Sequence, residues 1–197
     1  AAEREDIDLS PFTLEHAGSI LSMHDDPMWT VREKRDSSMS VGLLLLKEGA
    51  GDALVSAGST GGLVAGASLL VKRLKGIRKA ALCPLIPSDQ GPFLLLDSGA
   101  NIDCRPEMLQ QFGIMGSAYM SAVMGIENPR VGLANIGAEE SKGTPLYREA
   151  YPLLQAAPIH FIGNVEAREI PFGHCHVVVA DGFTGNIFLK TCEGTAA

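Results

Sequence analysis

The sequence is poor in aromatic residues, in charges and in cysteines, and the scarcity of cysteines excludes a class of protein. Aromatic residues make up 6% of the 197 residues and charged residues 20%, whereas 46% are hydrophobic. The four cysteines form no CxxC pair and no dense framework, which excludes a disulfide scaffold and indicates a reducing, cytoplasmic compartment. The 22 glycines follow no period and no heptad is present, so a collagen or a coiled coil is also excluded. We expect residues 1–197 to form a single domain with one sizeable core.

Basic residues are scarce as well. Sixteen Lys and Arg against 23 Asp and Glu give a net charge of −7 and a pI near 5.2, whereas proteins that bind nucleic acid usually present a basic surface. We therefore expect no nucleic-acid partner. The densest basic cluster is Lys72, Arg73, Lys75, Arg78 and Lys79. It is either a docking patch for an acidic protein or a solvated helix end that the helix dipole favours.

Targeting and membrane-spanning patterns are weak. Residues 1–12 are acidic where a secretory signal would be basic and then apolar, so we expect no signal peptide there. Ala53–Val71 is an uncharged run of 19 residues, close to spanning length, but Gly58–Gly62 interrupts it. A strand, a loop and a helix start account for this run better than a membrane span does.

Apolar runs rich in β-branched residues alternate with helical patterns along most of the chain. The runs predict strands at Ile20–His24, Ala53–Ala57, Ala80–Ile86, Phe93–Asp97, Val131–Ile136, Ile159–Val165 and Val177–Ala180. Helices are predicted at Ser37–Glu48, Thr60–Lys75, Pro106–Met124 and Pro145–Gln155. This alternation predicts an α/β fold with an open, mostly parallel sheet and helices on both faces.

Five of the apolar runs end in small, hydrogen-bonding residues: SAGSTGG, DSGANIDC, NIGAEESKG, GNVEAR and DGFTGN. A single ending of this kind would be explained as an ordinary turn. Five in one chain favour a ligand crevice, because the carboxyl ends of parallel strands lie along one edge of the sheet, where open α/β folds bind ligands.

The first ending, Gly58-Ser59-Thr60-Gly61-Gly62, precedes a predicted helix. Backbone N–H groups at such a place suit an anion such as phosphate, and the alternative is a glycine-rich turn required by close packing. In the second ending, Asp97 and Asn101 are site candidates because they lie near the strand end, whereas we expect Asp103 to cap the following helix.

Two further endings carry candidate catalytic groups. Lys142 lies in a glycine-flanked loop beside Glu139 and Glu140, where it offers positive charge to a ligand or forms a salt bridge with one of the two acids. Asn186 follows Gly185 near a presumed helix start, where it donates an amide N–H to a developing oxyanion or caps the helix.

Other catalytic patterns find no support. His174-Cys175-His176 places two imidazoles on one face of a strand, but no second pair has ligand spacing, so we expect a turn and no metal. The sequence has no GxSxG motif, and Cys104 and Cys192 have no identifiable base, which argues against a protein nucleophile.

Taken together, these segments resemble the bacterial acyl-acyl carrier protein:phosphate acyltransferase family of phospholipid synthesis. The matching stretches keep the family's order: Lys34–Met39, Val55–Gly61, Asp97–Glu107, Asn135–Gly143, Phe161–Arg168 and Asp181–Lys190. Ser59 departs from the Asn usual in the family, although Ser also donates and accepts a hydrogen bond. The resemblance identifies the chain as an internal portion that lacks the family's N- and C-terminal segments.

The resemblance implies a sandwich related to phosphotransacetylases and isocitrate dehydrogenases, and an enzyme that moves a long-chain acyl group from acyl carrier protein to inorganic phosphate. It implies a cytoplasmic homodimer with no cofactor and no metal, and it leaves open a peripheral attachment to the inner face of the membrane. Lys142 and Asn186 are its catalytic candidates. The substrate-binding candidates are Gly58, Ser59, Thr60, Gly61, Asp97, Asn101, Asn135, Glu140, Asn164 and Asp181.

Two other functions fit the same residues. A phosphotransacetylase acting on acyl-coenzyme A would use similar phosphate and oxyanion groups. A lipid- or carrier-binding module would use the crevice to hold a ligand without turnover. Phosphate-dependent loss of a thioester distinguishes an enzyme from such a module, and the preferred thioester distinguishes the two enzymes.

Overall fold

A computed structural model describes residues 8–196 of the chain, so that residues 1–7 of the acidic stretch 1–12 lie outside the described residues. The chain divides into two compact units, Ala1–Leu74 and Lys75–Ala197, here called unit 1 and unit 2. The single-domain organisation stays a prediction.

Unit 1 contains short helices. They are η2 (Pro27–Thr30), α1 (Ser38–Glu48), α2 (Thr60–Gly66) and the π-helical η3 (Ala67–Val71). The Ser37 side chain accepts a hydrogen bond from Ser40 N, and Gly49 ends α1 at φ +78°. Both boundaries confirm the predicted helix, because a Ser cap and a left-handed Gly are its expected start and stop.

The strands predicted in unit 1 are wrong. Ile20–His24 and Ala53–Ala57 are irregular, and the only bridge near them pairs Ser19 with Ser37 among the described residues. Ile20 is 83% exposed and Val55 is 96% exposed. An apolar run forms a strand only where a neighbouring strand accepts its backbone hydrogen bonds, and none lies beside these runs in the described part of unit 1.

Unit 2 is built on a mixed sheet of five strands. The strands are β1 (Leu85–Ile86), β2 (Phe93–Leu96), β3 (Arg130–Asn135), β4 (His160–Glu166) and β5 (Val177–Val179), in the order β1-β2-β5-β3-β4. Four of them are parallel, and β1 pairs with β2 in the antiparallel sense at the edge. The predicted α/β fold with a mostly parallel sheet is confirmed.

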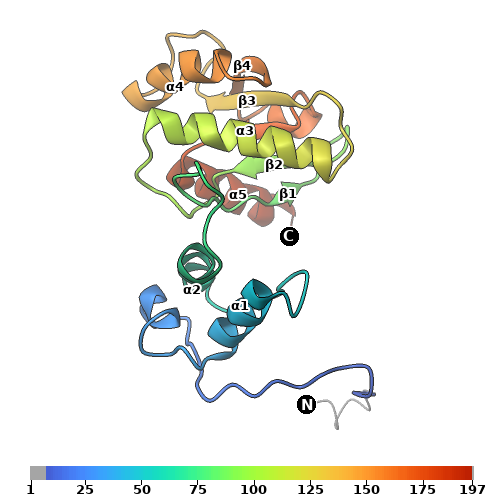
Figure 1. The fold of residues 1–197 in the computed structure, drawn as a ribbon. Helices are drawn as coiled ribbons and strands as arrows, with labels where there is room; N and C mark the ends of the chain where they lie inside the picture. Colours follow the sequence, from blue (N-terminus) through green and yellow to red (C-terminus); the bar gives the residue numbers. More distant parts are fainter. Residues whose placement is uncertain (1–7, 197) are drawn as a thin grey trace. The chain divides into compact units, whose positions relative to one another are not determined.

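Helices cover both faces of this sheet. Leu94 and Leu96 of β2 pack on the side of α3 (Pro106–Ala122) and α4 (Pro145–Gln155). Phe93 and Leu95 of the same strand point to the other side, toward α5 (Gly182–Ala196) and the short η4 (Ile170–Phe172). In Figure 1, α3 lies in front of the sheet, beside β2 and β3. The alternation along β2 shows why its residues are uniformly apolar, since both sides of a parallel strand are buried.

The predicted start of α3 needs a correction. Arg105 occupies the N-cap position and provides no side-chain hydrogen bond, whereas Asp103 lies exposed two residues earlier. Pro106 occupies the first helical position, where its fixed φ and missing N–H are tolerated, and this places the cap beyond the reach of Asp103. The predicted capping by Asp103 is therefore wrong.

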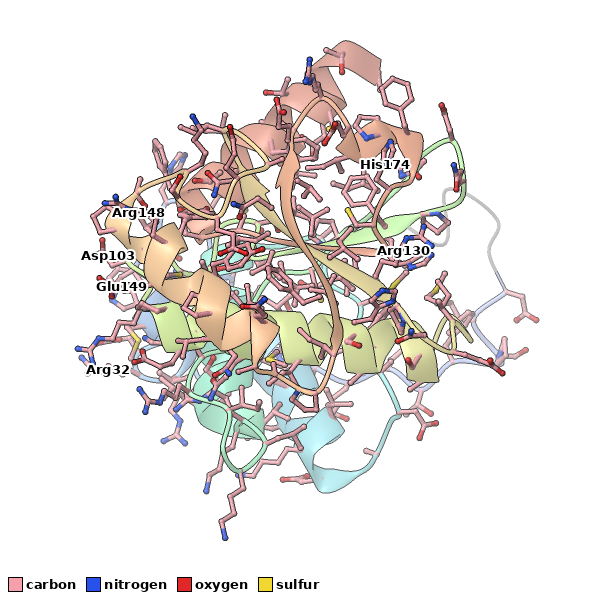
Figure 2. All side chains as sticks on the ribbon, turned by 90° about the horizontal axis from the view of Figure 1, so that it is seen from above. Arg32, Asp103, Arg130, Arg148, Glu149 and His174 are labelled. Atoms are coloured by element: carbon pink, nitrogen blue, oxygen red, sulfur yellow. The ribbon has the colours of Figure 1, made fainter. Side chains whose placement is uncertain are left out.

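The two ends of the sheet carry different groups. Figure 2 shows Arg130 and His174 together at one end, with Asp103 and Arg148 at the other. Arg130 begins β3, donates to His174 O at 2.8 Å through Nε, and donates its backbone N–H to His176 Nδ1 at 2.9 Å. The 174–176 segment thus closes the amino end of the sheet, and the described residues contain no group of three or more potential metal ligands.

No helix in the described part of the chain is long and apolar enough to cross a membrane.

Candidate active site

Four of the five polar endings noted in the sequence meet at the carboxyl edge of the parallel strands. Asp97 follows β2, Asp181 lies just beyond β5, Asn135 is the last residue of β3, and Glu166 is the last residue of β4. The fifth ending, Gly58–Gly62, belongs to unit 1 and follows an irregular segment. The carboxyl edge of unit 2 is thus the candidate ligand site, since open α/β folds bind ligands there.

Asp97 organises the loop that follows β2. Its fully buried carboxylate accepts hydrogen bonds from the backbone N–H groups of Leu82 at 2.9 Å, Ala100 at 3.2 Å and Asn101 at 2.6 Å. Asn101 Nδ2 donates to Asp97 Oδ2 at 2.9 Å and to Ala80 O at 2.7 Å. The buried Asp97 and the half-buried Asn101 therefore form a pair that fixes the shape of this edge.

Asp181 caps α5 and binds α4. Its Oδ1 accepts from the backbone N–H groups of Phe183 at 2.9 Å and Thr184 at 3.0 Å, and its Oδ2 accepts from Tyr147 Oη at 2.6 Å and Thr184 Oγ1 at 2.7 Å. Burial alone would raise the pKa of Asp181, but these hydrogen bonds lower it below its ordinary value. Burial, and then the bond to Asp181, raise the pKa of Tyr147.

Asn186 lies in the second turn of α5, and its Nδ2 donates to Ser98 O at 3.2 Å. It does not cap the helix, because Asp181 performs that role. A Cβ at the neighbouring Gly185 would overlap the carbonyl oxygen of Asp97, so only glycine allows α5 to approach β2 this closely. The Asn186 amide is exposed at this contact and has a second N–H available for a ligand.

The other half of the edge is a loop between β3 and α4. Asn135 Nδ2 donates to Lys142 O at 3.1 Å, and Asn164 Nδ2 donates to Glu139 O at 2.8 Å, so two amides hold the loop from below. Gly143, at φ +91°, packs against the Asn135 side chain. Asn164 Oδ1 is buried without a hydrogen-bond partner among the described residues.

Lys142 and Glu140 are exposed on this loop. Within residues 8–196, Lys142 forms no ion pair with Glu139 or Glu140, so the structural alternative of a salt bridge is not formed. Glu140 lies beside Tyr151, whose pKa is raised by burial and then by the Glu140 charge. Lys142 is thus a cation free to meet an anion at the edge.

A cavity of about 630 Å³ connects the two halves of the edge. Asn135 and Gly143 line it from the β3 loop, Tyr147 from α4, and Thr184 and Gly185 from α5. The immediate neighbours of both catalytic candidates, Gly143 beside Lys142 and Gly185 beside Asn186, therefore border one open space.

The glycine-rich candidates of unit 1 form a helix start of their own. Ser59 is buried and caps α2 by accepting from Gly62 N at 3.2 Å, while Thr60 and Gly61 are exposed. Gly58 N donates to Ser56 Oγ at 3.2 Å. Ser59 thus has a structural role, and anion binding by Gly58–Gly61 stays a prediction.

Sequence reasoning missed Tyr147, Thr184 and Arg168. The Tyr147–Asp181 hydrogen bond joins residues 34 positions apart, and no local pattern signals it. Thr184 follows Asp181 by three residues, and this spacing at a helix start is a sequence signal that could have identified it. Arg168 pairs with Glu166 at the end of β4 and lines the cavity.

The sequence matches a known family of proteins. The family model described as "Fatty acid synthesis protein" matches residues 4–197. Among curated relatives, a phosphate acyltransferase of Halalkalibacterium halodurans is 54% identical over 182 residues, which are 92% of this chain and 54% of the relative. A phosphate acyltransferase of Alkaliphilus oremlandii is 50% identical over the same shares.

Among solved structures, the EutD phosphotransacetylase from Staphylococcus aureus matches with a TM-score of 0.69 at 19% sequence identity, over 99% of this chain and 70% of that chain. This likeness confirms the predicted phosphotransacetylase-like fold. The chain spans about half the length of the curated relatives it matches. By its match over nearly every residue, the chain belongs to the fatty acid synthesis protein family, whose curated members here are phosphate acyltransferases.

Proposed function

We propose that the protein transfers a long-chain acyl group from an acyl carrier protein thioester to inorganic phosphate and so forms an acyl phosphate. The observation that supports the proposal is the carboxyl edge of unit 2, where Gly143 and Gly185, the immediate neighbours of Lys142 and Asn186, border one cavity. The names of the relatives supply the reaction type, acyl transfer to phosphate.

The reaction needs no protein nucleophile. A phosphate oxygen attacks the carbonyl carbon of the thioester, a C–O bond forms, and the C–S bond then breaks to release the carrier thiolate, which takes up a proton. Negative charge develops on the carbonyl oxygen while an anion approaches it. The site must therefore position two substrates and supply fixed positive charge and neutral donors.

Lys142 and Asn186 fit these two tasks. The exposed ammonium of Lys142 attracts phosphate and offsets its charge. The Asn186 amide, already oriented by its bond to Ser98 O, donates its second N–H to the developing oxyanion. Asn135 and Asn164 hold the Lys142 loop, while Asp97, Asn101 and Asp181 shape the other side of the edge.

The finer assignments belong to the same proposal. The partners are acyl carrier protein, phosphate and a second copy of the chain, and the place of action is the cytoplasm, with a peripheral attachment to the membrane. The exposed basic cluster Lys72–Lys79 is the docking patch for the acidic carrier. Reversing Arg73 and Arg78 to Glu is expected to raise the KM for the carrier substrate, and unchanged kinetics at all ionic strengths would contradict the patch.

The test offers acyl carrier protein thioester and acyl-coenzyme A side by side to the native protein that contains this chain, with and without phosphate. Phosphate-dependent loss of the carrier thioester supports the proposal. A preference for a short acyl-coenzyme A would favour a phosphotransacetylase, the function of the EutD structure that shares the fold. Tight binding of the carrier without turnover would indicate a binding module instead of an enzyme.

A further inference from the structure

The cavity at the edge extends well away from the catalytic candidates. It follows the sheet face that α5 covers, and its floor includes Leu95 and Val178 of the central strands. Ile187, Phe188 and Cys192 line it from successive turns of α5. Ile187 is 53% exposed although it is large and apolar, so this helix leaves an apolar wall uncovered.

We propose that this cavity, here called the α5 groove, holds the acyl chain of the thioester substrate with its carbonyl end at Asn135 and Thr184. The proposal rests on the proposed function, since it names where the acyl substrate of that reaction lies. Nothing in the reaction chemistry at Lys142 and Asn186 requires a groove on this face of the sheet.

The distribution of polarity along the groove matches a molecule with one polar end. Asn135 and Thr184 lie at the carboxyl edge, and Arg168 follows β4 at the same edge. Arg168 is the only charged residue among the described residues that line the groove, and most of the others are apolar or small. A nucleotide would need several more polar partners along its length, whereas an acyl chain needs none.

The size of the groove also suits an acyl chain. Its volume of about 630 Å³ lies within the range of small-molecule sites. Thr184 and Thr195 both line it, and eleven residues of α-helix separate them by about 16 Å. The groove is therefore elongated along α5, which suits a chain of many methylenes better than a short acyl group.

Cys192 provides a reporter inside the groove. Its half-buried thiol lines the cavity, whereas Cys83 is exposed and lies outside the lining. Burial raises the pKa of Cys192, so labelling with a maleimide is best followed at mildly alkaline pH. Palmitate is expected to slow labelling of Cys192 at least tenfold and to leave the labelling rate of Cys83 unchanged. Octanoate at equal concentration is expected to protect Cys192 far less, because each buried methylene tightens binding by about fourfold.

Thr191→Trp tests the groove by filling it. Thr191 lines the groove from α5, and Glu193→Trp places the same side chain on the same helix outside the lining. Thr191→Trp is expected to weaken palmitate binding at least tenfold with little change for octanoate, and Glu193→Trp is expected to change neither. Equal protection of Cys83 and Cys192, or equal palmitate affinity in both variants, would overturn the proposal.

The same variants separate this proposal from the proposed function. If palmitate protects Cys192 but phosphate-dependent turnover is absent, the α5 groove stands and the proposed reaction fails. If turnover occurs and Thr191→Trp leaves its preference for long acyl chains unchanged, the reaction stands and the groove fails.

Discussion

The two halves of the carboxyl edge differ in how completely their polar groups are used. At the ends of β2 and β5, the carboxylates of Asp97 and Asp181 are buried and each accepts four hydrogen bonds. Beyond β3, Lys142 and Glu140 are exposed on a loop, and Asn164 of β4 keeps a buried oxygen without a partner in the described structure.

This difference separates the acidic and basic groups that stabilise the fold from those that are available to a substrate. A carboxylate that already accepts four bonds has little capacity left for a ligand, so its removal damages the structure. An exposed lysine without an ion pair contributes little to stability, so its removal affects what binds to it. We propose that Asp97 and Asp181 serve the framework, whereas Lys142 on the loop between β3 and α4 and Asn186 on α5 meet the substrate.

The largest effect is expected from Asp97→Ala. Four donors lose their acceptor in a fully buried place, and each unsatisfied group costs about 1–3 kcal/mol, so the free energy of unfolding should fall by at least about 3 kcal/mol. Denaturant unfolding followed by circular dichroism measures it. A loss below about 1 kcal/mol would contradict the framework role of this half.

Lys142→Ala and Asn186→Ala should lower kcat by about two orders of magnitude or more, the usual loss for one oxyanion-type donor, with little change in Tm. Steady-state kinetics with the carrier thioester and thermal unfolding on the same preparations measure both. Lys47→Ala, at the end of α1, is the matched control for loss of an exposed lysine. Near-normal turnover would remove the catalytic assignment, and loss of activity together with stability would favour a structural role.

Tyr147→Phe removes the hydrogen bond that Tyr147 Oη donates to the Asp181 carboxylate, together with the bond that the same Oη accepts from Asp181 N. We expect a loss of about 2 kcal/mol near neutral pH, the cost of a hydrogen bond to a charged group. The folded pKa of Asp181 lies below its ordinary value of 3.8, so the stabilisation is fully present above that value and is lost as pH falls through the folded pKa.

The difference in unfolding free energy between Tyr147→Phe and the unchanged protein should therefore shrink below about pH 4. Denaturant titrations from pH 7 to pH 3 measure it. A difference that stays constant across this range would show that the tyrosine hydroxyl does not act through the Asp181 charge.

Asp103→Ala should have the smallest effect. The side chain is exposed and caps nothing, so the free energy of unfolding should change by less than about 0.5 kcal/mol. The same denaturant assay used for Asp97→Ala measures it, and a loss above about 1 kcal/mol would restore a capping role.

Local patterns predicted most of unit 2. Pro145–Gln155 forms a helix with the predicted bounds, because a proline at the start and an apolar face define it locally. The strand cores at Phe93–Leu96 and Val177–Val179 were also predicted, since apolar residues buried on both faces give a continuous run. The placement of polar endings at one edge followed from the parallel sheet.

The failed strand predictions depend on distant partners, whereas the failed cap at Asp103 has a local cause, Pro106 at the first helical position. Ile20–His24 and Ala53–Ala57 resemble strands in composition, but no strand lies beside them in the described part of unit 1, and no local pattern reveals this. Likewise, the role of Asp181 as both helix cap and partner of Tyr147 depends on α4 meeting α5. The sequence identified the candidate residues by their position after strands. Only the structure showed which of them are buried and hydrogen-bonded and which are exposed.

The most direct test of the account is the detection of the acyl phosphate itself. The native protein is incubated with long-chain acyl carrier protein thioester and phosphate, and hydroxylamine traps the product as a hydroxamate. Reactions in which chloride replaces phosphate correct for direct attack of hydroxylamine on the thioester. The account predicts a hydroxamate yield that rises with phosphate concentration and falls about a hundredfold or more in Lys142→Ala, with Tm unchanged. Thioester loss that is independent of phosphate, or full product formation by folded Lys142→Ala, would contradict it.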